Sequence, residues 1–72
     1  MTAEQREAFR RNIKYYLLDH DVKQKDLAEA AGVSDQFMSM VVNGDKKPPF
    51  DVVLALSRFM GVTVEDLITL KK

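Results

Sequence analysis

The sequence predicts an all-α fold, a compact bundle of five short helices. Apolar residues recur at intervals of three and four positions in several segments, which is the spacing of one helix face. No segment alternates apolar and polar residues as a half-buried strand does, and cap signals mark most segment ends. With a length of 72 residues and no internal repeat, the chain is expected to form a single domain, residues 1–72.

The first predicted helix opens at Thr2, because Gln5 follows three residues later and the two can form a capping box. Helical spacing then directs one set of side chains to the core: Phe9, Ile13, Tyr16, Leu17 and, at its edge, His20. The opposite face carries both charges and is expected to be solvated: Glu4, Arg6, Glu7, Arg10, Arg11 and Lys14. Tyr15 and Leu18 fall off the core stripe and are expected to be exposed.

Two short helices joined by a tight turn are predicted between residues 24 and 44. The first spans Gln24–Ala31, and Gly32 follows where a left-handed cap is favoured. Ser34 is placed to cap the second, which runs through Val42 and is stopped by Asn43-Gly44. Two helices on a three- to four-residue turn containing glycine form a helix-turn-helix. A helical hairpin that only packs inside a bundle is the alternative.

The fourth and fifth helices follow a loop that contains Pro48-Pro49. Helix four is expected over about Phe50 to Met60, with a core face formed by Phe50, Val53, Leu56, Ser57 and Met60. Val52, Leu54 and Phe59 lie off that face. Thr63 with Asp66 forms a second capping box and opens helix five in the segment TVEDLITL, where Ile68 and Leu70 are surplus to the core.

Composition excludes several classes of protein. There is no cysteine, one histidine and no phosphate-cradling glycine loop, so we expect no enzyme, no metal, no cofactor and no small-molecule substrate. No segment resembles a signal peptide or a membrane span, and we expect a cytoplasmic protein without a membrane partner. The 11 basic and 11 acidic residues balance, which does not favour nucleic-acid binding by net charge.

The joint spacing of several motifs resembles the lambda-repressor-like helix-turn-helix family, which includes phage repressors, Cro proteins and many small bacterial regulators. The motifs cover nearly the whole chain: Gln24, Leu27-Ala28, Ala31-Gly32-Val33-Ser34, Asn43-Gly44, Lys47-Pro48, and Phe50, Val53, Leu56, Met60-Gly61-Val62-Thr63 and Leu67. Many members pair an Arg late in helix one with a Glu before the Asn-Gly. Here Leu17 and Val42 hold those positions, and we expect them to share one apolar patch.

The resemblance implies a sequence-specific DNA-binding regulator of phage or bacterial type, whose partner is a double-stranded DNA operator. The helix over about residues 34–42 would enter the major groove. The positions that match base-reading residues are Asp35, Gln36, Ser39 and Met40, and those that match phosphate contacts are Gln24, Asn43, Lys46 and Lys47. Met38 and Val41 match core positions. For each polar position, an ordinary solvated helix start or turn is the alternative.

A second hypothesis is a protein-interaction module on the same fold, such as an anti-repressor, a modulator of a partner repressor or an antitoxin. No Arg or Lys lies in the predicted recognition helix, and its Phe37 and Met40 are apolar. The surplus apolar residues could form a partner patch, a dimer face or a ragged core edge: Phe37, Met40, Val52, Phe59, Ile68 and Leu70. The protein partner would be a second copy or a partner repressor.

Overall fold

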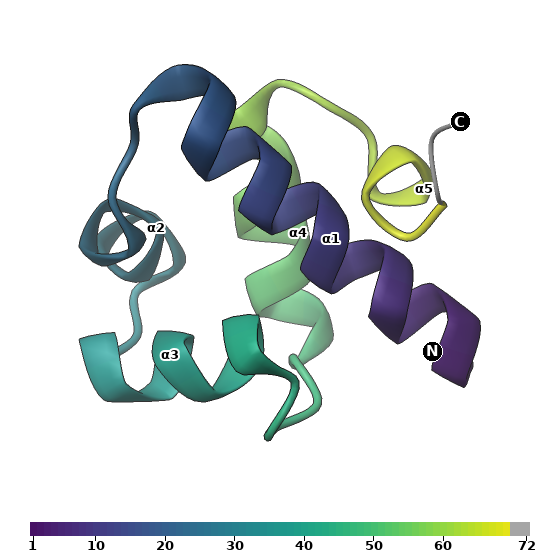
Figure 1. Cartoon of the computed structure of the whole chain (residues 1–72). Helices are drawn as coiled ribbons and strands as arrows, with labels where there is room; N and C mark the ends of the chain where they lie inside the picture. The colour runs from purple at the N-terminus through teal and green to yellow at the C-terminus, as the bar shows by residue number, and fades with distance from the viewer. Residues whose placement is uncertain (70–72) are drawn as a thin grey trace.

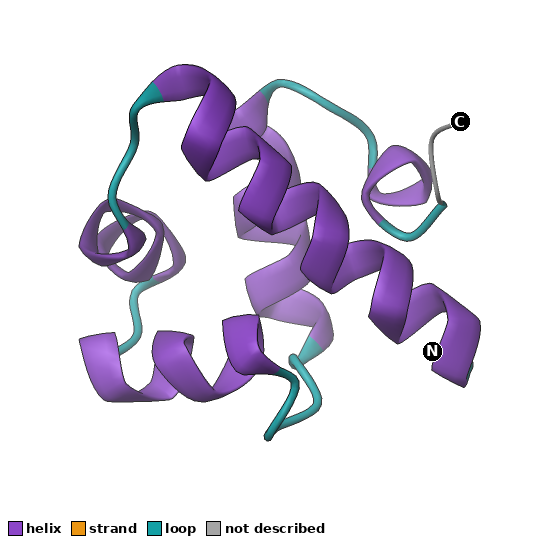
Figure 2. Cartoon of the chain, viewed as in Figure 1, coloured by secondary structure: helices purple, strands orange, loops and turns teal. Residues whose placement is uncertain are grey.

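Five α-helices make up the described part of the chain, residues 1–69 of a computed structural model (Figure 1). In chain order they are α1 (Ala3–His20), α2 (Gln24–Ala31), α3 (Asp35–Asn43), α4 (Phe50–Met60) and α5 (Val64–Leu67). Figure 2 shows that loops alone connect them, and residues 1–69 contain no strand. The predicted fold class is therefore confirmed. Helix three runs one residue further than expected, to Asn43, and α5 ends at Leu67.

The two predicted capping boxes fix the starts of α1 and α5. Thr2 Oγ1 accepts from the Gln5 amide at 3.1 Å, and Gln5 Oε1 accepts from the Thr2 amide at 2.9 Å. The Thr63 hydroxyl accepts from the Asp66 amide at 3.0 Å, and the Asp66 carboxylate accepts from the Thr63 amide at 3.3 Å. Each box satisfies amides that the first helical turn leaves without partners.

All five helices contribute to one buried apolar cluster. In the view of Figure 1, α1 runs in front of α4, with α2 to the left, α3 below and α5 to the right. α2 packs against α3 and α4, and α5 packs against α1 and α4. Burial of each large aliphatic or aromatic side chain in the cluster contributes about 1.5–3 kcal/mol relative to exposure. The buried apolar residues are Ala8, Phe9, Ile13, Leu27, Ala28, Met38, Val41, Val42, Val52, Val53, Leu56 and Leu67.

The core face of α4 differs from the prediction at two positions. Val52, expected off the face, is only 4% exposed, and Phe50, expected in the core, is 67% exposed. At 3.6 residues per turn, the buried stripe of Val52, Val53, Leu56 and Ser57 leaves Phe50 about a quarter-turn from its middle. Phe50 is also the first helical residue, so it lies at the end of the stripe as well as at its edge.

Leu17 and Val42 both belong to the apolar interior, and a direct contact between them stays a prediction. Val42 belongs to the buried cluster and Leu17 packs against that cluster. An apolar pair at these positions leaves no charge without a partner.

The outer end of α1 carries exposed rings and aliphatic groups. Tyr15 and Leu18 are exposed, as expected. His20 is exposed too, so the prediction that it lies at the core edge is wrong. Its ring stacks on that of Tyr16 with 4.1 Å between the ring centroids, because the two lie one turn apart, and Tyr16 itself is half-buried.

Asn12 joins α1 to α5, a contact that the sequence did not predict. Its Nδ2 donates to the carbonyl oxygens of Asp66, Leu67 and Thr69 at 3.1, 2.9 and 3.0 Å. α5 is one turn long, so the carbonyl groups at its end receive no hydrogen bond from a following helical turn. The Asn12 side chain of α1 supplies a donor in its place. Within residues 1–69, no helix is both long enough and apolar enough to cross a membrane.

Candidate nucleic-acid interface

α2, the turn and α3 form the predicted helix-turn-helix, with α2 seen nearly end-on and α3 running across the view in Figure 1. Lys23 lacks an acceptor to cap α2, and Asp26 Oδ2 instead accepts from the Lys23 amide at 3.1 Å. Gly32 closes α2 in the left-handed conformation at φ 70°. Ser34 Oγ then accepts from the Phe37 amide at 3.0 Å, which fixes the first turn of α3.

The residues of α3 divide into a buried face and an outward face. Met38, Val41 and Val42 are buried in the core. Asp35 and Gln36, in the first turn, are fully on the surface. The remaining predicted contact positions, Phe37, Ser39 and Met40, are half-buried, and Asn43 is exposed at the end of the helix. The outward face therefore offers side chains of the first turn most freely.

Lys46 provides the cation that α3 itself lacks. No basic residue lies between Asp35 and Asn43, but the Lys46 ammonium sits 5.2 Å from the centroid of the Phe37 ring. This separation is within the range in which a cation is attracted to the ring face. Lys46 comes from the loop after α3, and its amide donates to the Met40 carbonyl at 3.2 Å. The loop thus places one positive charge beside the outward face of α3.

The other three residues predicted to contact phosphate, Asn43, Lys47 and Gln24, do not form one cluster. Asn43 Nδ2 donates to Ser39 Oγ at 3.3 Å, so a phosphate position and a base-reading position touch. Lys47 is exposed in the loop, and Gln24 is half-buried at the start of α2. Among residues 1–69, Gln24 makes no side-chain hydrogen bond to any of these groups.

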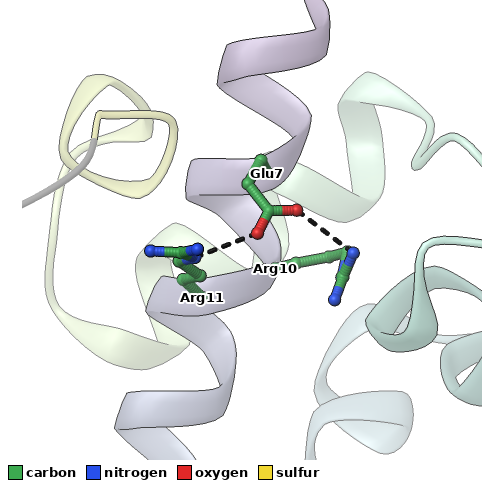
Figure 3. Close-up of polar contacts among 3 residues, drawn as sticks. All are labelled: Glu7, Arg10 and Arg11. Carbon is green, nitrogen blue, oxygen red and sulfur yellow. Dashed lines mark hydrogen bonds and ion pairs between the residues drawn. The ribbon is translucent and has the colours of Figure 1, made fainter.

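Sequence reasoning placed Arg6, Glu7 and Arg10 on a solvated face, whereas all three are half-buried. They line a hollow of about 190 Å³ between α1 and the loop after α3, and Lys46 lines it as well. In Figure 3 the Glu7 carboxylate lies between two guanidinium groups, accepting from Arg10 Nη1 at 3.1 Å and Arg11 Nε at 2.9 Å. The signal was absent from the sequence, because only folding brings the start of α1 to the loop.

The members of the predicted partner patch differ in their exposure. Val52 is buried in the core, which removes it from the patch, and Ile68 is half-buried against the core. Phe59 is 41% exposed and meets the Tyr16 ring edge-on at 6.2 Å between centroids. Leu70 lies outside the described residues. Within the described chain, no group of three metal-ligating side chains comes together.

Comparisons with known proteins agree with this geometry. Residues 12–72 match the family described as the Cro/C1-type HTH DNA-binding domain. The chain is 34% identical over 55 residues to a protein of Methanocaldococcus jannaschii named as an uncharacterized HTH-type transcriptional regulator. That alignment covers 76% of this chain and 83% of the relative. No solved structure matches the chain.

Proposed function

The chain belongs to the Cro/C1-type HTH DNA-binding domain family, and from this premise we propose that it is a sequence-specific DNA-binding transcriptional regulator. α3 would lie in the major groove of a double-stranded operator, as the second helix of a helix-turn-helix does. The observation that carries the proposal is the outward first turn of α3, held by the Ser34 cap and flanked by Lys46.

Base reading is assigned to the polar side chains of α3. Gln36 is exposed and can bond adenine through two hydrogen bonds, while Asp35 can accept from a cytosine amino group. Ser39 tolerates several bases, and Met40 offers apolar contact to a thymine methyl. Because Asp35 is repelled by phosphate, it contributes to base preference rather than to affinity.

Phosphate binding is assigned to groups around α3. Lys46 and Lys47 come from the loop, Asn43 from the end of α3 and Gln24 from the start of α2. Such contacts fix the position of the protein on the duplex without reading sequence. If two copies bind one operator, their half-sites should lie about 34 Å apart, one turn of the double helix. A regulator of this kind, of phage or bacterial type and located in the cytoplasm, could act by blocking a promoter.

Selection from random duplexes tests the proposal. The protein should enrich one sequence, and affinity for that sequence should fall with salt at a slope of about 0.9 per neutralised phosphate. Gln36→Ala should relax the preference at one base pair and leave the salt slope unchanged, because it removes a base contact alone. Failure to enrich any sequence, with weak and nearly salt-independent binding, would reject it.

A second candidate function is a protein-interaction module that uses the same α3 face. The observation in its favour is that α3 carries no basic residue while Phe37 and Met40 remain half-exposed on it. Aromatic and methionine side chains are enriched at protein interfaces. The partner would be a second copy or a partner repressor. Phe37→Ala and Met40→Ala should then abolish heteromer formation with a purified repressor, whereas Gln36→Ala should not.

A further inference from the structure

The hollow between α1 and the loop after α3 has the residues of an oxyanion site. Its polar lining consists of Arg6, Arg10 and Lys46 with one carboxylate, Glu7. The lining of this hollow, whose volume is about 190 Å³, therefore carries three cations and one anion. Both Glu7 oxygens are already engaged, one by Arg10 and one by Arg11, and Arg11 is not part of the lining. The positive charge of the hollow is only partly neutralised from within.

Arg10 is the cation most closely built into this hollow. A Cβ added to Gly44 would lie 2.8 Å from Arg10 Cδ and 3.3 Å from Nη1, so the side chain lies directly against the glycine backbone. Nη1 donates to Glu7, whereas the buried Nε has no hydrogen-bond partner in residues 1–69. A guanidinium has five N–H donors in a planar fork that matches phosphate geometry. Because Nε is buried, the terminal Nη groups are the Arg10 donors that a ligand in the hollow would meet.

The hollow lies beside the surface assigned to DNA. Val41 and Gly44 at the end of α3 line it, and Lys46 lines it while its ammonium also sits over Phe37 on α3. A DNA strand that passes the C-terminal end of α3 would therefore pass the mouth of the hollow. The family match begins at residue 12, so neither Arg6 nor Arg10 falls within it.

We propose that this hollow binds a phosphate oxyanion of the DNA backbone, held by Arg10 and Lys46 with Arg6 at its edge. The inference rests on the proposed function, because DNA supplies the phosphate. It adds α1 to the interface, and it assigns Arg10 a role that is distinct from the role of its neighbour Arg11. The group bound would be a phosphate in either case, whether it belongs to a DNA duplex or is free in solution.

Arg10→Gln and Arg11→Gln form a matched pair that tests this site. Each substitution removes one positive charge and one ion pair with Glu7 (Figure 3). Of the two arginines, only Arg10 lines the hollow. Against a selected duplex, Arg10→Gln should lower the salt slope by about 0.9, the value for one phosphate contact, and Arg11→Gln should leave it unchanged. Arg10→Lys should retain most of the slope, and thermal melts should show that all three variants fold.

Inorganic phosphate provides a readout that does not need DNA. Its titration should shift the backbone amide resonances of Gly44 and Lys46 in the wild-type protein and in Arg11→Gln, and not in Arg10→Gln. Equal salt slopes for Arg10→Gln and Arg11→Gln, in a wild-type protein that binds DNA, would overturn the inference. Saturable phosphate binding without any DNA binding would overturn the proposed function and the DNA source. The oxyanion site itself would then still be supported.

Discussion

The turns that follow α2 and α3 carry the same sequence signal and differ in what surrounds them. Each helix ends at a glycine in the left-handed conformation, at φ 70° for Gly32 and φ 84° for Gly44. A Cβ at Gly32 would meet no atom within 4 Å, whereas a Cβ at Gly44 would lie 2.8 Å from Arg10 Cδ. Backbone conformation alone favours the first glycine, while a Cβ at the second would also displace the Arg10 side chain of α1.

The second turn is thereby fixed from two directions. Within the turn, the Asp45 and Lys46 amides both donate to the Met40 carbonyl, at 2.8 and 3.2 Å. From outside, Arg10 of α1 covers Gly44. In the first turn, the Val33 amide donates to the Ala28 carbonyl at 3.0 Å, and the Val33 side chain packs against the core. The second turn differs in that a charged side chain from α1 lies against its glycine.

The largest expected effect is that of Gly44→Ala. Left-handed backbone costs a residue with Cβ about 1–2 kcal/mol, and the flexible Arg10 side chain must also move away from the new Cβ, which disturbs its ion pair with Glu7. Gly32→Ala should cost the conformational part alone. Urea denaturation should therefore show a larger loss of unfolding free energy for Gly44→Ala, with equal m-values if the native fold is retained.

Arg10→Ala tests whether the contact with Arg10 causes the difference in cost between Gly44→Ala and Gly32→Ala. Arg10→Ala removes the side chain that the new Cβ would meet, so Gly44→Ala should cost no more than Gly32→Ala in that background. A double-mutant cycle gives the coupling between positions 10 and 44. Equal costs for the two glycine substitutions with Arg10 in place would show that the contact carries no energetic weight.

Local signals predicted most of the fold. Thr2 with Gln5, Gly32, Ser34 and Thr63 act on backbone groups within a few residues, and the structure confirms each cap. Positions that depend on which helix lies opposite were less predictable. The predicted face of α4 is confirmed at Val53, Leu56 and Ser57, and the errors at Val52 and Phe50 lie at its two edges, because helical spacing fixes a stripe but not the limits of its cover.

The site was predictable in part for the same reason. The outward placement of Asp35 and Gln36 follows from the turn and the cap, which are encoded locally. The approach of Lys46 to Phe37 and of Arg10 to Gly44 depends on tertiary packing, so charge counting along the chain did not reveal either contact. Asn12, whose side chain closes α5, was missed because an asparagine in the middle of a helix gives no sign of a partner 54 to 57 residues away.

Ser34→Ala should have an intermediate effect and tests the local character of the first turn. Loss of the bond from the Phe37 amide to Ser34 Oγ removes an N-cap, which costs about 1 kcal/mol. Ser39→Ala is the control, because the exposed bond from Asn43 to Ser39 Oγ caps no helix end, and it should cost less than about 0.5 kcal/mol. Thermal melts of the two variants should show the larger loss of stability for Ser34→Ala. A larger loss for Ser39→Ala would mean that the first turn does not depend on its cap.

The smallest expected effect concerns the attachment of the second turn to α3. Phe37→Leu removes the ring face beneath Lys46, and Lys46→Met removes the cation while keeping an unbranched apolar chain. Their double-mutant cycle should give a coupling of about 0.5–1 kcal/mol, the value for an exposed cation–π pair. The Lys46 methylene protons next to the ammonium should lie upfield in the wild-type protein and in Phe37→Tyr, and lose that shift in Phe37→Leu. With no coupling and no shift, Lys46 would not attach the loop to α3, and the contrast between the two turns would rest on the contact of Arg10 with Gly44.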